Sequence, residues 1–200
     1  MTYFEALTEA MTQLAREPKV VFMGQGVACA GTSMTDTLAG VPRENVLQLD
    51  KVIEFPVAED LQMGMAIGMA IEGWLPICIF PRWNFLLCAA NQLINHLDRL
   101  PLYSGGGYHP RVIIRVAAPS TSPFYPGPQH DDDFTDSFRR MLRTVKVVKL
   151  DEAAKVIPAY REAVHAASST LLVEYAERYK DRTPSGVGSK EKEDERVAVD

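Results

Sequence analysis

The sequence predicts an α/β fold of three layers, with a mostly parallel, twisted sheet between two layers of helices. Short aliphatic runs alternate with longer segments of helical periodicity along the chain. Such alternation implies parallel strands with helices on both faces of the sheet. The length of 200 residues and a hydrophobic content of 46% suit one domain with a sizeable core.

Local signals place the elements in order. Apolar residues at helical spacing predict a first helix over residues 3–16, which Pro18 ends. A β-branched run closed by Gly24 predicts a buried strand over 19–23. Acids at the start of 131–142 and arginines at its end match a helix dipole. The other expected strands are 46–49, 75–80, 111–116, 145–149 and 170–175, and the other expected helices are 59–72, 84–100 and 152–167.

We expect residues 1–179 to form this domain. Residues 180–200 are charged and poor in large apolar groups, so we expect a flexible tail there.

Composition and charge disfavour several classes of protein. The net charge of −5, from 21 basic and 26 acidic residues, disfavours a nucleic-acid binder, which would present a basic face. The N-terminus lacks a basic segment followed by an apolar one, and Glu72, Pro76 and Pro81 interrupt the longest apolar run, so we expect neither a signal peptide nor a membrane span. Cys78 and Cys88 lie in apolar runs and no CxxC occurs, which predicts buried free thiols in a reducing, cytoplasmic compartment.

The expected helix over residues 59–72 carries the strongest functional signal. No polar residue occurs between positions 63 and 71, so this helix should be covered on several sides. Gly64 and Gly68, four residues apart, would let another backbone come close, either inside this domain or across a subunit interface. Burying the carboxylate of Glu59 at the helix start is unfavourable unless the group has a use. The alternative is that Glu59 only complements the positive end of the helix.

In a sheet of this kind, ligands bind beyond the carboxyl ends of the strands. We therefore expect the chemistry in the loops 24–30, 50–59, 81–85 and 117–130.

A collinear set of short motifs carries a family resemblance. The chain resembles the beta subunits of 2-oxoacid (pyruvate) dehydrogenases and, more broadly, the pyrimidine-binding domain of transketolase-like thiamine diphosphate enzymes, over most of its first 180 residues. The motifs are Phe55-Pro56-Val57-Ala58-Glu59, the helix with Gly64 and Gly68, Gly73-x-x-Pro76-Ile77-Cys78, Phe80, Asn84-Phe85, Gln92-x-Ile94-Asn95, Gln129-His130 and Leu171-Leu172-Val173-Glu174.

The resemblance implies that thiamine diphosphate is the cofactor and that Glu59 activates it. In that family the matching glutamate hydrogen-bonds a ring nitrogen of the aminopyrimidine, which promotes removal of a proton from the thiazolium carbon. Phe85 matches an aromatic residue that stacks on the pyrimidine, and Pro81 is assigned to the cofactor site with it. His130 matches a histidine that handles protons near the thiazolium. Core packing of Phe85 and plain exposure of His130 are the alternatives.

The resemblance also implies a partner chain. The family holds the diphosphate through Mg²⁺ on a different domain, with a Gly-Asp-Gly motif followed by an asparagine, and no Gly-Asp-Gly occurs in this sequence. We therefore expect no metal site in this chain, a partner subunit that brings the diphosphate and Mg²⁺, and a heterotetramer. The family's beta subunits continue into a further α/β domain beyond the matched region. We do not expect that domain here, because the sequence becomes a charged tail near residue 180. This favours a stand-alone decarboxylase, an acyloin carboligase or a split transketolase over a dehydrogenase complex.

Four further residues are weaker candidates for contact with substrate. Arg82 could meet an anionic substrate, and Trp83 could narrow a pocket. His109 lies in a glycine-rich loop, and Gln129 adjoins the histidine of the motif. Each could equally be a surface residue. The three acids at 131–133 are interpreted as a helix start in preference to a metal site.

The predicted function is a subunit of a two-chain thiamine diphosphate enzyme that acts on a 2-oxo acid or a ketose, by decarboxylation or by ketol or acyl transfer. One alternative is a non-catalytic binding or regulatory module of the same fold. Another is a flavodoxin-type nucleotide-binding domain, which Gly24-Gln25-Gly26 supports poorly because no clear helix start follows it.

Overall fold

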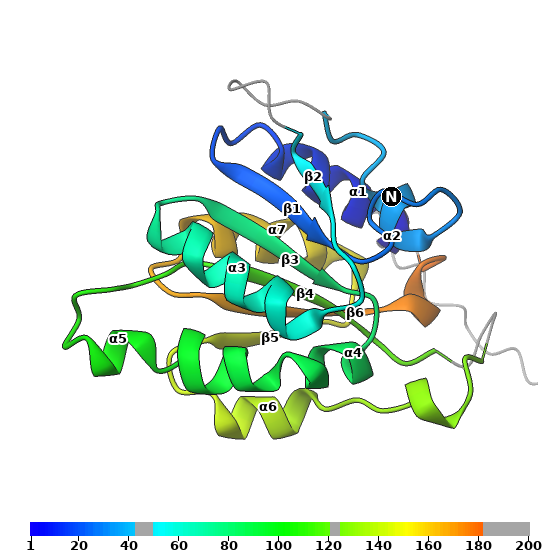
Figure 1. Cartoon of the computed structure of the whole chain (residues 1–200). Coiled ribbons are helices and arrows are strands. Elements are labelled where there is room, and N and C mark those ends of the chain that lie inside the picture. Colours follow the sequence, from blue (N-terminus) through cyan, green and yellow to red (C-terminus); the bar gives the residue numbers. More distant parts are fainter. Residues whose placement is uncertain (43–49, 121–124, 182–200) are drawn as a thin grey trace, which may run out of the picture.

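A computed structural model describes residues 1–42, 50–120 and 125–181. In this part of the chain, six strands form one wholly parallel sheet in the order β2-β1-β3-β4-β6-β5 (Figure 1). The three-layer α/β prediction is therefore confirmed. No helix in the described ranges is long and apolar enough to cross a membrane. The strands are β1 (Val20–Gly24), β2 (Val52–Glu54), β3 (Leu75–Phe80), β4 (Ile113–Ala118), β5 (Lys146–Leu150) and β6 (Thr170–Tyr175).

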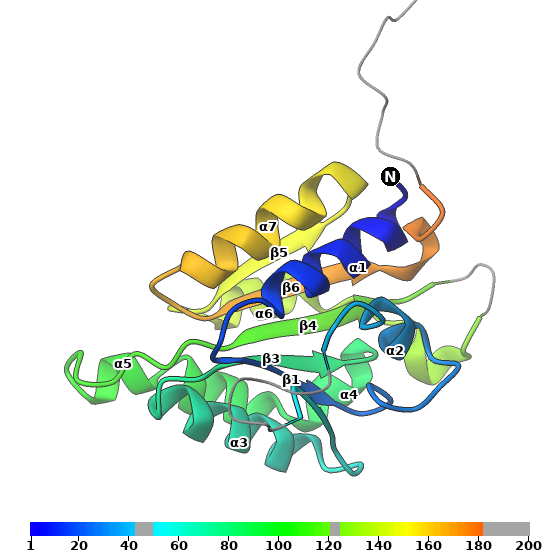
Figure 2. The same ribbon diagram turned by 90° about the horizontal axis from the view of Figure 1, so that it is seen from above.

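Helices cover both faces of this sheet. Figure 2 shows α1 and α7 on one side and α3, α4 and α5 on the other. The two faces follow from the twofold alternation of side chains along each strand. In β3, Ile77 and Ile79 pack with α1 and α7, whereas Cys78 and Phe80 pack with α3 and α4. The helices are α1 (Tyr3–Leu14), α2 (Ser33–Thr37), α3 (Glu59–Ile71), α4 (Trp83–Cys88), α5 (Leu100–Tyr103), α6 (Thr135–Met141) and α7 (Ala153–His165), with 3-10 turns at η2 (Pro128–His130) and η3 (Ala176–Arg178).

Most of the expected elements lie within two or three residues of their predicted bounds. The expected strand at 46–49 falls outside the described residues, and the strand that pairs with β1 in this region is β2, at Val52–Glu54. Helix α6 begins at Thr135 rather than at position 131. The expected tail falls largely outside the described ranges, but Asp181 accepts a backbone hydrogen bond from Tyr3 (2.7 Å).

One buried ion pair joins the middle of the sheet to the last described turn. Arg115 on β4 and Glu174 on β6 are both fully buried, and two guanidinium nitrogens donate to the two carboxylate oxygens at 2.7 and 3.1 Å. Thr37 accepts a third hydrogen bond from Arg115, and the hydroxyl of Tyr179 donates to Glu174. Although burial alone would lower it, the pKa of Arg115 is raised above its ordinary value by the charge of Glu174.

The prediction of a single long helix over 84–100 was wrong. The chain forms α4, then a π-helix over Gln92–Leu97, then the short α5, which begins at Leu100 with Pro101 in its first turn. Each π turn holds one residue more than an α turn, with bonds such as Asp98 N–H to Leu93 C=O. The wider turn puts Leu93, Leu97 and Asp98 on one buried side. A regular helix would have turned Asp98 away.

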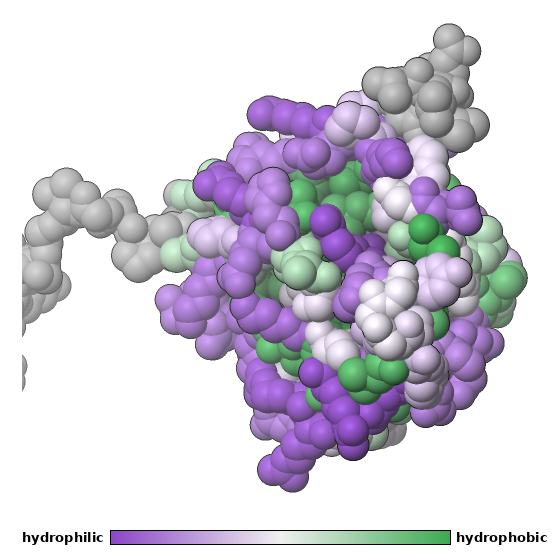
Figure 3. Space-filling model, turned by 90° about the vertical axis from the view of Figure 1, so that its left-hand side faces the viewer, coloured by the Kyte–Doolittle hydropathy of each residue, from purple (hydrophilic) through white to green (hydrophobic). Residues whose placement is uncertain are grey.

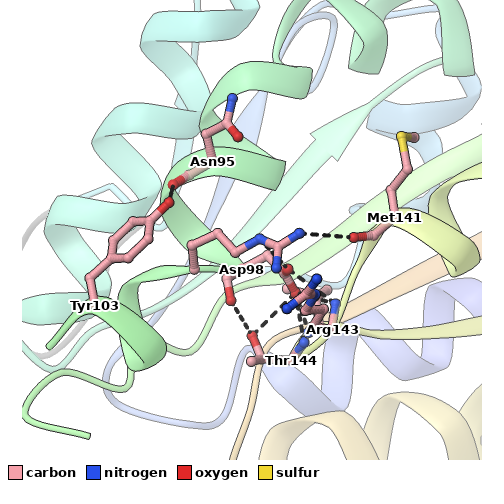
Figure 4. Close-up of polar contacts among 8 residues, drawn as sticks. Asn95, Asp98, Tyr103, Met141, Arg143 and Thr144 are labelled. Carbon is pink, nitrogen blue, oxygen red and sulfur yellow. Dashed lines mark hydrogen bonds and ion pairs between the residues drawn. The ribbon is translucent and has the colours of Figure 1, made fainter. Parts of the chain in front are cut away.

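The carboxylate of Asp98 is a second buried anchor (Figure 4). It accepts backbone hydrogen bonds from Arg143, Thr144 and Val145 at 2.7 to 3.0 Å, just before β5. The Thr144 hydroxyl donates back to the Asp98 carbonyl, and Tyr103 donates to the Asn95 carbonyl one turn earlier. The carboxylate therefore ties the end of the π-helix to the loop that starts β5.

The cysteines only partly follow the expectation. Cys78 in β3 is buried, and burial raises the pKa of its thiol to about 12. Cys88 was expected to be buried as well, but it lies exposed at the end of α4, because the outer side of that helix is uncovered in the described chain.

We expect Asp98→Asn to lower the free energy of unfolding by about 2–4 kcal/mol, because the amide would turn a donor towards backbone donors and leave buried N–H groups unpaired. Urea denaturation followed by circular dichroism measures this. Asp136→Asn is the control, because its ion pair with Arg139 lies at the surface and is worth at most about 1 kcal/mol. Equal, small effects of both changes would contradict the anchoring role.

Candidate functional site

The candidate site lies at the carboxyl edge of the sheet, on the right in Figure 1. Three of the connections at this edge carry the main candidate residues: the loop from β2 to α3, the turn from β3 to α4, and the segment after β4 that contains η2. α3 packs against α4, and α4 packs against η2. The parallel sheet therefore gathers Glu59, Phe85 and His130 on adjoining elements, although 71 positions (130 − 59) separate the first from the last.

Glu59 is the first residue of α3 and is only 7% exposed. No group in the described ranges donates a hydrogen bond to its carboxylate or forms an ion pair with it. No side chain caps the helix either, because the N-cap position is Ala58. A sheltered carboxylate with no protein partner is unfavourable in an isolated chain, and only the positive end of the helix offsets this. Within the described residues, neither carboxylate oxygen is used by the protein.

Phe85 and His130 lie against each other. Their ring centroids are 5.3 Å apart and their planes differ by 28°, so the rings stack. Phe85 is on the first turns of α4, and His130 ends η2. Both side chains are half-buried. The sequence assigned both residues to one site, and the structure brings them together as an aromatic platform.

Several buried polar atoms at this edge have no hydrogen-bond partner within the described part of the chain. They are Gln25 Nε2, Arg82 Nη1, Asn84 Oδ1 and His130 Nδ1. They come from the turn after β1, from the turn after β3 and the first turn of α4, and from η2. Buried polar atoms are ordinarily paired, so this group marks a place where an external molecule could satisfy them. Gln25 was not among the residues predicted from the sequence.

The loop after β1 is closed by a carboxylate. Glu54, at the end of β2, accepts hydrogen bonds from the backbone N–H groups of Gly26 and Ala28 at 2.6 and 2.7 Å. These are the groups that would cradle a phosphate in a flavodoxin-type nucleotide site. A carboxylate already occupies them, which argues against that alternative.

Two of the weaker candidates lie away from this site. Trp83 is fully buried and packs against Phe134 and Phe138 in the core, so it does not line a pocket. His109 precedes β4 and therefore lies at the opposite, amino edge of the sheet. Gln129 is exposed on η2, beside the platform.

The remaining candidate residues lie in the turn between β3 and α4 and in the run of three acids at 131–133. Pro81 and Arg82 are half-buried in that turn. Asp132 accepts a hydrogen bond from Asn84, and Asp133 accepts one from the backbone N–H of Thr135 at the start of α6. The described residues hold no group of three or more His, Cys, Asp or Glu side chains that could bind a metal ion.

The outer side of α3 is bare. Its inner side is buried through Gln62, Met63, Ala66, Ile67 and Ala70, but Leu61, Met65 and Ile71 are 52%, 44% and 43% exposed. The expectation that the helix is covered on several sides is therefore not met by this chain alone. No atom lies within 4 Å of the position where a Cβ on Gly68 would stand, so close packing inside the described domain does not explain this glycine.

The model of one protein family, the transketolase pyrimidine binding domain, matches residues 1–180. The pyruvate dehydrogenase E1 component subunit beta of Staurastrum punctulatum is 35% identical over 116 residues, which is 58% of this chain and 34% of that protein. The chloroplastic subunit beta-2 of Arabidopsis thaliana is 27% identical over 184 residues, which is 90% of this chain and 44% of that protein. The chain thus spans less than half the length of these relatives.

Solved structures show the same fold. A split-gene transketolase, solved as an inactive beta4 tetramer, superposes with a TM-score of 0.67 at 17% identity, over 97% of this chain and 56% of that one. The transketolase of Campylobacter jejuni gives a TM-score of 0.71 at 13% identity, over 94% of this chain and 28% of that one. Since the family model matches nearly the whole chain and the fold agrees, the protein belongs to the family of transketolase pyrimidine binding domains.

Proposed function

We propose that this chain is one subunit of a two-chain, thiamine diphosphate-dependent enzyme that cleaves or forms a carbon–carbon bond next to a carbonyl. The single observation that carries the proposal is the carboxylate of Glu59, which is sheltered, stands at a helix start and lacks a protein partner in the described chain. Family membership and the beta-subunit relatives support the choice of cofactor.

The residues at the carboxyl edge fit a flat, polar ring. Glu59 would accept a hydrogen bond from a ring N–H, or hold a proton at a carboxylate oxygen, and its shelter from water would strengthen that bond. Phe85 would offer an aromatic face, with His130 stacked against it. The unpaired Nδ1 of His130 would hold or pass a proton near the reacting atoms. When bound, thiamine diphosphate supplies the electron sink that stabilises a carbanion.

The diphosphate and its Mg²⁺ would be held by a partner subunit with a Gly-Asp-Gly motif. The carboxyl edge of this chain is acidic and offers no unoccupied nest of backbone N–H groups after β1, because Glu54 takes that position. The bare side of α3 supplies an apolar surface for the second wall of the site, with Gly68 at a point where another backbone could approach. We propose a heterotetramer built on this contact.

The substrate class follows the chemistry of the relatives. The curated relatives are pyruvate dehydrogenase beta subunits, and the structural neighbours are transketolases. A 2-oxo acid and a ketose are therefore the two candidate substrates, for decarboxylation or for ketol or acyl transfer. The half-buried guanidinium of Arg82, with Nη1 unpaired in the described chain, favours a substrate that carries a negative charge.

We expect Glu59→Gln, assayed with the partner chain present, to lower turnover by about 100-fold or more, since an amide cannot hold the proton. Asp60→Asn is the matched control. Asp60 is the exposed neighbour in the same helical turn, and its loss should change turnover by at most about fivefold, the size of a helix-dipole effect. Circular dichroism and a melting curve check the fold of both variants. Equal activities of the two variants would leave Glu59 with only the helix-complementing role.

We expect the isolated chain with Mg²⁺ to bind thiamine diphosphate weakly or not at all, because this chain provides only one side of the site. Titration calorimetry should record heat of binding only after the partner is added. The partner to test is the product of a neighbouring reading frame that encodes Gly-Asp-Gly and a downstream asparagine. Tight, Mg²⁺-dependent binding to this chain alone would contradict the division of the site between two chains.

We expect Gly68→Met to leave the isolated chain folded and to stabilise it by about 0.5–1 kcal/mol, because glycine is a poor helix former and the added side chain meets open space. The same change should weaken assembly with the partner, measured by analytical ultracentrifugation. Ala154→Met, at an exposed position of α7, is the control that should not affect assembly. Unchanged assembly of the Gly68 variant would remove α3 from the interface.

A further inference from the structure

A cavity of about 640 Å³ opens at the amino edge of the sheet, away from Glu59. Its lining comes from segments that are far apart in the sequence: the residues before β1, the end of α3, the loop before β4 and the end of α7. Figure 3 faces this edge, where apolar surface is recessed between hydrophilic residues. The cavity does not belong to the site described above, because it lies at the opposite ends of the strands.

The titratable side chains around the cavity are mostly basic. Lys19, Arg111, His109 and His165 line it, and Glu17 is the acid among the lining residues. The side chains of Lys19, His109 and His165 make no hydrogen bond or ion pair with any residue in the described ranges. Arg111 donates one hydrogen bond to the Val164 carbonyl at 2.6 Å, and its buried Nε has no partner there. A guanidinium carries five donor hydrogens, so most of its capacity is unused.

Helix ends explain only part of this cluster. α1, α3 and α7 all end at this edge, and helix C-termini attract cations. The end of α7 uses one donor of Arg111. The carbonyl groups just after α1 already have a cationic donor. The buried ammonium of Lys51 donates to the carbonyls of Ala15 and Glu17, both at 2.7 Å. The helix ends therefore do not account for Lys19 and the two histidines, which line the cavity.

The rest of the cavity is apolar. Val20, Ala70, Leu75 and Val164 are buried and form its inner surface, and the half-buried indole of Trp74 lies beside them. Cationic groups next to an aromatic and aliphatic surface suit a molecule with an anionic head and an apolar body. Inorganic phosphate alone would leave most of the volume unfilled.

We propose that this cavity binds a small organic anion, a carboxylate or a phosphate ester with a flat or aliphatic body. Lys19 and Arg111 contact its charged head, and Trp74 packs against its body. The position excludes the substrate of the carboxyl edge as the occupant, so this inference does not depend on the proposed function.

The chain has two tryptophans, and they make the test specific. Trp74 lines the cavity, whereas Trp83 is fully buried at the other edge. The full chain labelled with 5-fluorotryptophan therefore gives two fluorine NMR signals, which Trp74→Phe assigns. The probes are benzoate, its neutral counterpart benzamide, phenyl phosphate and inorganic phosphate. We expect benzoate or phenyl phosphate to shift the Trp74 signal saturably while the Trp83 signal stays fixed, and benzamide to cause no shift.

Two variants and one control complete the experiment. Lys19→Gln and Arg111→Gln should each weaken binding about fivefold to tenfold, the loss of one charge-assisted contact. Lys19 is exposed, so its variant remains informative if the Arg111 variant fails to fold. Arg140→Gln, an exposed change on α6, should leave binding unchanged. A stronger response to phenyl phosphate than to benzoate would identify a phosphate head. The proposal is overturned if Trp74 responds to no probe, if benzamide binds as well as benzoate, or if Arg140→Gln weakens binding as much as Lys19→Gln.

Discussion

The buried pair of Arg115 and Glu174 is the interaction on which the middle of this fold depends. It links β4 to β6 where strand pairing could otherwise slip, and its remaining polar atoms are taken by Thr37 and Tyr179. A fully buried pair contributes little net stability against an apolar replacement, but removing one partner leaves an uncompensated charge. The pair therefore fixes the register of β4 and β6. β4 ends at Ala118, ahead of the segment that carries His130, so the pair holds the strand that precedes that segment.

The same contrast between paired and unpaired charge separates the two kinds of buried acid in the molecule. Asp98 and Glu174 are surrounded by donors and serve the fold. Glu59 is 7% exposed, whereas Asp98 and Glu174 are fully buried, and it has no donor in the described chain. A sheltered carboxylate without a partner is unfavourable, and this supports the proposal that a ligand or another chain pairs with Glu59. The uncovered apolar side of the helix that carries Glu59 supports the same interpretation.

The sequence predicts the fold well, because most strands and helices follow local patterns, whereas the site residues were assigned from the family resemblance. Periodicity placed the strands and α3, and the family motifs placed Phe85 and His130 together. The sequence could not predict the contact of Glu54 with Gly26 and Ala28, since a hydrogen bond across 28 positions leaves no periodic signal. The π-helix was missed for a related reason: its wider turn is set by the distant backbone groups that bind Asp98.

The position of His109 at the amino edge, in contrast, could have been predicted from the sequence. A residue just before the expected strand at 111–116 must lie at the amino edge of a parallel sheet, so His109 could not join residues that follow strands. The burial of Trp83 could not have been predicted from its position relative to the strands. It depends on Phe134 and Phe138, which follow a later strand and approach α4 only in the folded chain.

The two edges of the sheet have opposite electrical character, and this difference bears on both proposals. Helix N-termini ordinarily make the carboxyl edge attractive to anions. Here the acids Glu54, Glu59 and Asp60 and the run at 131–133 offset that attraction, so this edge suits a polar ring far better than a diphosphate. At the amino edge, the cations Lys19 and Arg111 outnumber the single lining acid, Glu17. In the proposed enzyme, a diphosphate at the carboxyl edge would therefore rely on cations of another chain besides Arg82, whereas the anion proposed for the amino edge would meet Lys19 and Arg111 of this chain.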